Sequence, residues 1–297
     1  MKDSEFTPRL TKDGSYTFFS QEFQETFHSS FGAKQEAEVK YIEPCAIASL
    51  ARQKSTIRLL DVCYGLGYNS AAALETIWSI NPECAVELFA LEIMSNVPKA
   101  AVEHNLLVQW QVSNAERSPI YKLLAELSRK YLVKDKFLSA KLLLGDARQT
   151  VKAVSESGWY ADAIFLDPFS PPKCPQLWTV EFITLLTQCL APTGRLATYS
   201  CSAAVRTALL TTGLNIASIW GAGRDAPGTI ASFEYKNIPQ LSLKEREHLA
   251  TRAAIPYRDP DLQDRPEQII ARRQQEQHNS TMETASRWRK RWLESYI

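Results

Sequence analysis

The sequence has no long hydrophobic run and no excess of one charge. Its 297 residues contain no uninterrupted apolar stretch of about 18, so a transmembrane helix is not expected. The 34 Lys and Arg residues against 33 Asp and Glu give a net charge of +1. A globally basic nucleic-acid-binding protein is therefore not indicated, although a local basic patch stays compatible with RNA binding. The hydrophobic fraction of 45% and the charged fraction of 23% exclude global disorder.

The cysteines form no Cys-x-x-Cys pair, so we expect no zinc site and no other metal. They lie in or beside apolar segments, as small buried hydrophobic residues do; the six are Cys45, Cys63, Cys84, Cys174, Cys189 and Cys201. The first ten residues are polar and lack the apolar core of a signal peptide. We therefore expect reduced thiols, a cytoplasmic location and no membrane partner.

Short apolar runs alternate with helical segments from residue 57 onward. The predicted strands are 57–63, 86–91, 141–144, 161–166 and 195–200, and the predicted helices are 70–80, 96–107, 181–190 and 205–210. This alternation predicts an α/β fold with a mostly parallel sheet covered on both faces. Two final strands, 214–220 and 229–235, follow each other without a helix, which predicts an antiparallel edge strand.

A glycine-rich turn follows the first predicted strand. Residues 60–69 read Leu-Asp-Val-Cys-Tyr-Gly-Leu-Gly-Tyr-Asn and lead into the first predicted helix. Glycines there let backbone N–H groups approach a ligand, and a helix N-terminus favours negative charge. The third glycine of the nicotinamide fingerprint is missing, which disfavours a dinucleotide. The candidate cofactor-binding residues of this turn are Tyr64, Gly65, Gly67 and Asn69.

Three acidic residues come at the carboxyl ends of predicted strands. Glu92, Asp146 and Asp167 should therefore face one crevice. An acid after the second strand is placed to accept both hydroxyls of an adenosine ribose. An acid after the third strand, with Ala147 beside it, can accept a hydrogen bond from the adenine amino group. A helix N-cap is the alternative role for any one of these acids, but the set in register predicts a Rossmann-like class I S-adenosylmethionine-dependent methyltransferase.

The Asp-Pro-Phe-Ser-Pro-Pro segment at 167–172 lies where such enzymes present groups to the methyl acceptor. Its prolines stiffen the loop, and methyl transfer needs the nucleophile in line with the sulfonium carbon. Asp167 is the candidate catalytic residue, because a carboxylate there can position an ammonium group or take its proton. A proline-rich turn without catalytic function is the alternative.

The composition divides the chain into three parts. Residues 1–52 form an N-terminal extension, with short strands and a helical segment at 36–51, which we expect to cover the site. Residues 53–237 form the S-adenosylmethionine-binding methyltransferase domain, and 238–297 form a polar and basic tail with helical character. In the tail, Trp288 and Trp292 flank three basic residues; we favour a docking role for these tryptophans over contact with RNA.

Several motifs are similar to those of one methyltransferase family. They are the segments 11–17 and 27–36, the turn at 63–69, the block 167–171 with Lys173 and Trp178, and Leu-Ala-Thr-Tyr-Ser at 196–200. Together they resemble the MnmC methyltransferase-domain family, the tRNA 5-methylaminomethyl-2-thiouridine methyltransferases. Two positions depart from the family pattern: Cys63 stands where glycine is usual, and Gly-Arg-Asp at 223–225 replaces Gly-Lys-Arg.

The resemblance implies methylation of the exocyclic amine of 5-aminomethyl(-2-thio)uridine at the tRNA wobble position, by a stand-alone form without the FAD-dependent oxidase domain. It implies tRNA as the partner, bound through its anticodon loop, and a link to the enzymes that make the aminomethyl intermediate. The substrate-binding residues that it implies are Asp13, Tyr16, His28, Lys173 and Arg224. The residues by themselves leave open a methyltransferase of another nucleobase amine or a small polyamine-like substrate, and a non-catalytic RNA-binding module.

Overall fold

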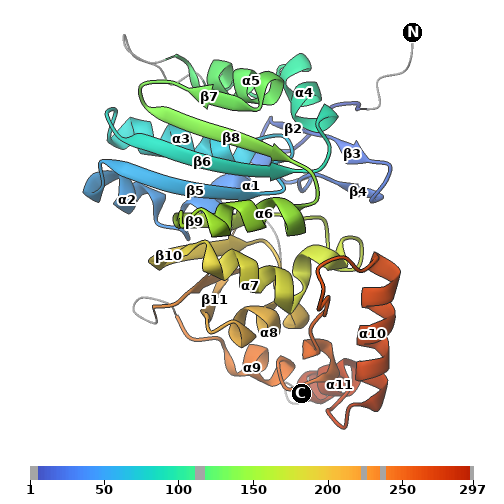
Figure 1. The fold of residues 1–297 in the computed structure, drawn as a ribbon. Helices are drawn as coiled ribbons and strands as arrows, with labels where there is room; N and C mark the ends of the chain where they lie inside the picture. Colours follow the sequence, from blue (N-terminus) through green and yellow to red (C-terminus); the bar gives the residue numbers. More distant parts are fainter. Residues whose placement is uncertain (1–5, 111–117, 222–225, 235–238, 295–297) are drawn as a thin grey trace.

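The computed structural model of the chain describes residues 6–110, 118–221, 226–234 and 239–294. Its centre is an eight-stranded sheet in the order β11-β12-β10-β9-β5-β6-β8-β7 (Figure 1). The strands are β5 (Thr56–Val62), β6 (Ala85–Glu92), β7 (Leu132–Lys134), β8 (Leu138–Leu144), β9 (Ala161–Leu166), β10 (Leu190–Thr198), β11 (Asn215–Ile219) and β12 (Gly228–Ser232). This is the α/β architecture that the sequence predicts.

Two strands run against the rest of the sheet. The C-terminal hairpin strand β12 is antiparallel to both β10 and β11 and lies between them, so it is not an edge. The antiparallel edge strand is instead β7, which pairs with β8 at the opposite side. The strand prediction missed β7 because its three residues come directly after a helix and are too few to show a strand pattern.

Helices cover both faces of the sheet, because side chains of a buried strand alternate between two cores. Ile57 and Leu59 of β5 pack in one hydrophobic cluster, and Leu60 and Val62 pack in the other. The first cluster includes residues of α1 (Ala33–Ala37), α2 (Ile47–Gln53), α3 (Tyr68–Ile80), α4 (Asn96–Glu103) and α5 (Ile120–Lys130). The second includes residues of α6 (Ala147–Glu156), α7 (Val180–Gln188) and α8 (Ala203–Thr211).

The N-terminal segment forms two small hairpins and then a broken helix. The hairpins are β1 (Arg9–Leu10) with β2 (Tyr16–Thr17), and β3 (Phe19–Ser20) with β4 (Glu25–Thr26). The single helix predicted at 36–51 is divided into α1, a π-helical turn at Glu38–Ile42, and α2. The division before α2 falls at Ala46, whose φ of 54° lies in the left-handed region and cannot continue a right-handed helix.

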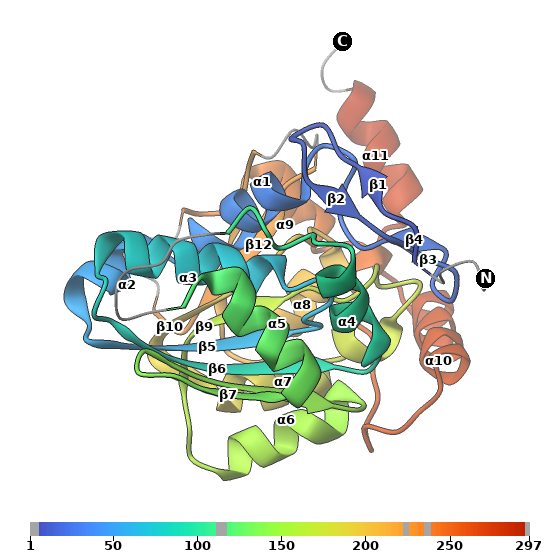
Figure 2. The same ribbon diagram turned by 90° about the horizontal axis from the view of Figure 1, so that it is seen from above.

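The C-terminal segment folds back along the molecule. It contains α9 (Leu243–His248), α10 (Pro266–Asn279) and α11 (Ala285–Glu294). Trp288 is buried and stacks on His248 with ring centroids 4.5 Å apart, and the Trp292 indole donates to Glu247 at 2.8 Å, so both tryptophans dock α11 as predicted. In Figures 1 and 2, α10 and the β3–β4 hairpin lie on the same side of the molecule, beyond the carboxyl ends of β6 and β8.

Candidate active site

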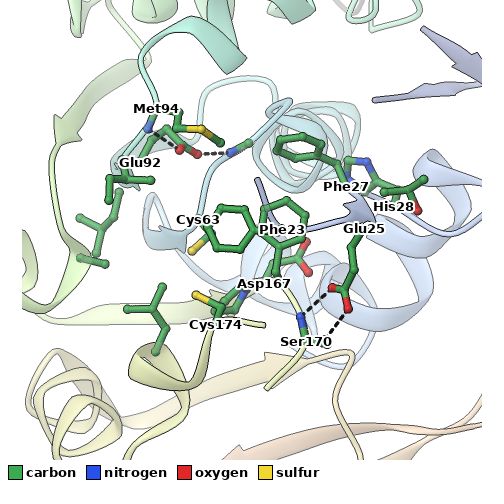
Figure 3. A pocket seen from close by; sticks show the side chains of 18 of the residues that line it. Phe23, Glu25, Phe27, His28, Cys63, Glu92, Met94, Asp167, Ser170 and Cys174 are labelled. Carbon is green, nitrogen blue, oxygen red and sulfur yellow. Dashed lines mark hydrogen bonds between the residues drawn. The ribbon is translucent and has the colours of Figure 1, made fainter. Parts of the chain in front are cut away.

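A cavity of about 520 Å³ lies at the carboxyl ends of the parallel strands (Figure 3). This volume is in the range of small-molecule sites. Its lining comes from the ends of β6, β8 and β9, the glycine-rich turn and the β3–β4 hairpin with the residues that follow it. Five carboxyl side chains line it, and no Lys or Arg of the described residues does; the five are Glu25, Glu36, Glu92, Asp146 and Asp167.

The glycine-rich turn is shaped by packing as well as by ligand access. Gly65 lines the cavity, and its N–H donates to Glu92 Oε2 at 2.8 Å. Gly67 has a φ of 82°, and a Cβ there would stand 2.5 Å from the hydroxyl of Tyr64. Tyr64 itself is buried, 3% exposed. Neither Tyr64 nor Gly67 is part of the cavity lining. Only Gly65 of the four turn residues singled out in the sequence therefore faces the cavity.

Glu92 is held rigidly at the cavity wall. Its two carboxylate oxygens accept the backbone N–H groups of Gly65 and Met94, each at 2.8 Å (Figure 3). Burial raises the pKa of Glu92, and these hydrogen bonds oppose that rise. A carboxylate has about four acceptor sites, so lone pairs remain for a ligand. Glu92 thus fits the ribose hydroxyls of an adenosine.

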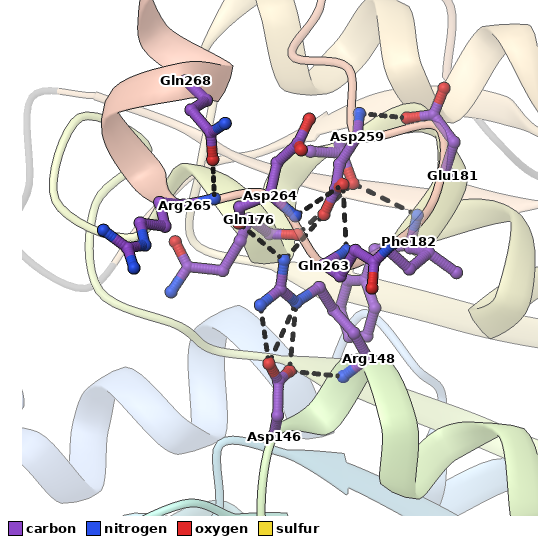
Figure 4. A network of polar contacts seen from close by, with 12 residues as sticks. Asp146, Arg148, Gln176, Glu181, Phe182, Asp259, Gln263, Asp264, Arg265 and Gln268 are labelled. Atoms are coloured by element: carbon purple, nitrogen blue, oxygen red, sulfur yellow. Dashed lines mark hydrogen bonds and ion pairs between the residues drawn. The ribbon is translucent and has the colours of Figure 1, made fainter.

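Asp146 caps the N-terminus of α6 and also forms an ion pair with Arg148 (Figure 4). It accepts from the backbone N–H of Arg148 at 2.9 Å, and its carboxylate pairs with the Arg148 guanidinium at 2.6 Å. The other side of that guanidinium pairs with Asp259 at 2.7 Å, and Asp259 is fully buried. The N-cap alternative is therefore correct for Asp146, which also lines the cavity with Ala147.

Asp167 follows β9 and lines the cavity. Its carboxylate accepts from the hydroxyl of Tyr41 at 2.5 Å and from the amide of Asn69 at 2.9 Å. Burial raises the pKa of Asp167 to about 8, against the lowering effect of the Tyr41 and Asn69 hydrogen bonds. Asn69 thus reaches the site through Asp167, although it is not part of the lining.

Aromatic side chains of the N-terminal segment close the cavity over the Asp-Pro-Phe-Ser loop. Phe23 stacks on Phe169 with ring centroids 4.4 Å apart, and Phe27 meets the same ring edge-on at 5.1 Å. The Glu25 carboxylate accepts from the backbone N–H of Ser170 at 3.0 Å and from its hydroxyl (Figure 3). Phe23, Glu25 and Tyr41 were not predicted as site residues, because no local pattern marks a side chain that acts across the fold.

The residues proposed from the sequence to bind substrate are scattered. His28 lines the cavity. Asp13 lies in the turn between β1 and β2, where it accepts from Ser15 and from the N–H of Gln35 at 2.9 Å. Tyr16 is 41% exposed and Lys173 is exposed, and neither is in the lining. Arg224 lies outside the described residues.

The part of the chain that the structure describes contains neither a membrane-spanning helix nor a metal-binding cluster. None of its helices combines the length and apolar composition that crossing a bilayer requires. Within the same ranges, no group of three or more His, Cys, Asp or Glu residues is arranged to hold a metal ion.

Comparison with known proteins assigns a class to this site. Residues 111–234 match the model of a family described as S-adenosyl-L-methionine-dependent methyltransferases. The crystal structure of MNMC2 from Aquifex aeolicus superposes with a TM-score of 0.80 at 33% identity, over 94% of this chain and 87% of that one. An uncharacterized protein of Methanocaldococcus jannaschii is 30% identical over 274 residues, which is 89% of this chain and 70% of that protein.

The fold, the cavity and these matches define an S-adenosyl-L-methionine-dependent methyltransferase, and S-adenosyl-L-methionine is its cofactor. Within that class, the chain belongs to the MnmC methyltransferase family. The bifunctional MnmC protein of Ralstonia nicotianae, named for tRNA 5-methylaminomethyl-2-thiouridine biosynthesis, is 26% identical over 76% of this chain. The chain spans about a third, 34%, of the length of that relative.

Proposed function

We propose that this enzyme methylates the exocyclic amine of 5-aminomethyl(-2-thio)uridine at the wobble position of tRNA. The observation that carries the proposal is the lining of the cavity: it contains five carboxyl side chains and, among the described residues, no Lys or Arg side chain. Such a wall favours a cationic amine over a phosphate or carboxylate. The names of the bifunctional MnmC relatives, which refer to tRNA 5-methylaminomethyl-2-thiouridine biosynthesis, support the same substrate.

The cofactor side of the site is the wall formed by the ends of β6 and β8. Glu92 would accept the ribose hydroxyls, and the Asp146–Ala147 step would contact the adenine, with Gly65 leaving room for the chain of the ligand. When bound, S-adenosyl-L-methionine supplies a methyl group on a cationic sulfur. Tyr64, Gly67 and Asn69 would act indirectly, by shaping the turn and by holding Asp167.

The acceptor side is the wall formed by Asp167 and the β3–β4 hairpin. Only the free-base form of an alkylamine attacks, and such an amine is protonated at neutral pH. Asp167, oriented by Tyr41 and Asn69, would hold the amine hydrogens and take its proton. An incoming ammonium group favours the ionised carboxylate and so lowers the raised pKa of Asp167. Phe23, Phe27 and Phe169 would pack around the uracil ring and exclude water.

This substrate fixes the other partners of the proposal. The acceptor would be the anticodon loop of a tRNA, and the enzymes that install the aminomethyl group would act before this one. We place the enzyme in the cytoplasm, with which its six free cysteines agree.

The test is methyl transfer to tRNA that carries 5-aminomethyl-2-thiouridine, followed by mass spectrometry of the wobble nucleoside. We expect a gain of one methyl group with the wild-type enzyme. Glu92→Ala should weaken S-adenosyl-L-methionine binding through loss of a charged hydrogen-bond acceptor, by about 1.5–3 kcal/mol, as measured by calorimetry. If the wild-type enzyme binds the cofactor but leaves this nucleoside unmodified, the proposed substrate is wrong.

A further inference from the structure

The first N-terminal hairpin displays apolar and basic side chains to solvent. Leu10 is 66% exposed, Tyr16 41% and Phe31 38%. Arg9 and Lys12 of the same segment are exposed as well. We call Leu10, Lys12, Tyr16 and Phe31 the hairpin face; Arg9 precedes Leu10 in the strand, so its side chain leaves the other side of the hairpin. Large apolar side chains gathered with cations on one small surface mark an interaction site more often than singly scattered ones do.

The hairpin face is held in one arrangement. Leu10 pairs with Tyr16 across the β1–β2 ladder, so their side chains leave the same side of the hairpin. The Lys12 ammonium lies 4.3 Å from the centroid of the Phe31 ring, and the Lys12 N–H donates to Ser30 at 3.0 Å. A surface ordered before binding loses less conformational entropy when a ligand arrives.

The hairpin that carries this face adjoins the cavity through its other side. The Arg9 guanidinium lies 4.6 Å from the centroid of Phe19, and Phe19 lines the cavity. On the other strand, the hydroxyl of Tyr68 donates to the backbone carbonyl of Tyr16 at 2.9 Å, which fastens the hairpin to the first turn of α3. Figure 2 shows β1 and β2 next to the β3–β4 hairpin, whose residues form the acceptor wall.

The chemistry of the face complements that of the cavity. The acidic cavity suits an amine but repels the phosphates on either side of it. A nucleotide that enters it therefore needs cations beside the cavity, and Arg9 and Lys12 provide them. Aromatic rings such as Tyr16 and Phe31 offer stacking surfaces to unpaired bases.

We propose that the hairpin face binds the single-stranded loop of the tRNA next to the target nucleotide. Tyr16 and Phe31 stack on bases that flank the target. Lys12 neutralises a phosphate on the same face, and Arg9 neutralises one on the cavity side of the hairpin. This inference rests on the proposed function, and it adds a recognition surface outside the cavity. It also predicts that the enzyme reads the shape of an open loop more than its sequence, because stacking tolerates any base.

The test compares four variants with two controls. The variants are Arg9→Ala, Lys12→Ala, Tyr16→Ala and Phe31→Ala, all at exposed positions where folding should be retained. The controls are Tyr160→Ala and Lys134→Ala, at exposed positions toward the amino ends of the strands, opposite the cavity. The readouts are the Kd for tRNA by filter binding, the single-turnover methylation rate at saturating tRNA, and the Kd for S-adenosyl-L-methionine.

We expect the Kd for tRNA to rise about tenfold for Tyr16→Ala and Phe31→Ala. Lys12→Ala and Arg9→Ala should each weaken tRNA binding and lower the slope of log Kd against log salt concentration by about one, which corresponds to the loss of one phosphate contact. The saturated rate, the cofactor Kd and both controls should stay at wild-type values. If the wild-type enzyme methylates tRNA and the four variants bind tRNA as tightly as the wild type does, the hairpin face is not the recognition surface. If the wild-type enzyme neither binds nor methylates tRNA, the proposed function fails first and this inference falls with it.

Discussion

The two ends of the chain reach the same cavity in different ways. The N-terminal segment sends Phe23, Glu25 and His28 directly into the lining. The described part of the C-terminal segment, 239–294, sends none; it contacts the site from behind, where Asp259 pairs with Arg148 and Arg148 pairs with Asp146. In the proposed site, one end of the chain would build the acceptor wall and the other would support the cofactor wall.

The physical means also differ. The N-terminal contacts are stacked rings and hydrogen bonds to one loop, such as Glu25 to Ser170. The C-terminal contact is a buried ion pair, in which Asp259 also accepts the N–H groups of Gln263 and Asp264 at 3.1 Å (Figure 4). Ring contacts at a cavity can rearrange around a substrate, whereas a buried charge tolerates no loss of its partner. Changes at the two ends should therefore affect different steps.

The largest expected effect is the loss of folding stability caused by Asp259→Ala. This substitution leaves the buried Arg148 guanidinium with one carboxylate fewer, and loss of one partner of a buried pair costs about 3–5 kcal/mol. Urea unfolding should show this loss, and binding of S-adenosyl-L-methionine should weaken because Asp146 loses its support. The control is Asp264→Ala, which removes a partly exposed pair with Arg272 and should cost less than about 1 kcal/mol. Equal destabilisation by the two variants would contradict a special role for Asp259.

Asp167→Asn should separate catalysis from cofactor binding. Asparagine keeps the shape of the side chain and removes its charge, so proton transfer and stabilisation of the forming cation are lost. We expect at least a ~100-fold fall in single-turnover methyl transfer, with the calorimetric Kd for S-adenosyl-L-methionine near the wild-type value. A variant that instead loses cofactor binding would move Asp167 to the cofactor wall.

The pH dependence of kcat/KM should reflect the ionisation of Asp167 and the hydrogen bond that Tyr41 donates to it. With a pKa of about 8 in the free enzyme, the Asp167 carboxyl is about one-tenth ionised at pH 7. Raising the pH from 7 to 9 should therefore increase kcat/KM about tenfold. Tyr41→Phe removes a hydrogen bond that lowers this pKa, so the rising limb should move to higher pH. A profile that stays in place in Tyr41→Phe would mean that another group produces the limb.

The smallest effect should come from Phe23→Ala. Loss of the stacked contact with Phe169 removes about 0.5–1.5 kcal/mol beyond simple burial. The KM for the tRNA acceptor should rise between about two- and tenfold, while the KM for S-adenosyl-L-methionine stays constant. An increase confined to the cofactor KM would remove the distinction between the two ends of the chain.

The local pattern of the sequence predicted the elements that form the cavity floor. The strands ending at Val62, Glu92, Leu144 and Leu166 follow from short apolar runs, and the glycine turn follows from its composition. Both signals are local, since strand periodicity and turn chemistry depend on neighbours within a few residues. Because parallel strands share one carboxyl edge, three acids that follow three strands had to meet.

Two expectations for the N-terminal segment differ from the structure. The local pattern predicted one helix at 36–51, and it did not foresee the left-handed Ala46, since alanine carries no turn signal. The family resemblance implied Tyr16 and Asp13 as substrate-binding residues, and the structure has them outside the cavity lining, in and beside the hairpin turn that orders the N-terminal segment. Their role in binding RNA stays a prediction.

By itself, then, the sequence determined the parallel sheet, its glycine turn and the row of acids at the strand ends, because those features depend on short-range order. The contacts of each acid depend instead on how the whole chain folds. Tyr41 reaches Asp167 across 126 positions, and Arg148 reaches Asp259 across 111. Such partners are chosen by how layers pack around the sheet and by the need to satisfy every buried charge, and neither condition leaves a mark in a local stretch of residues.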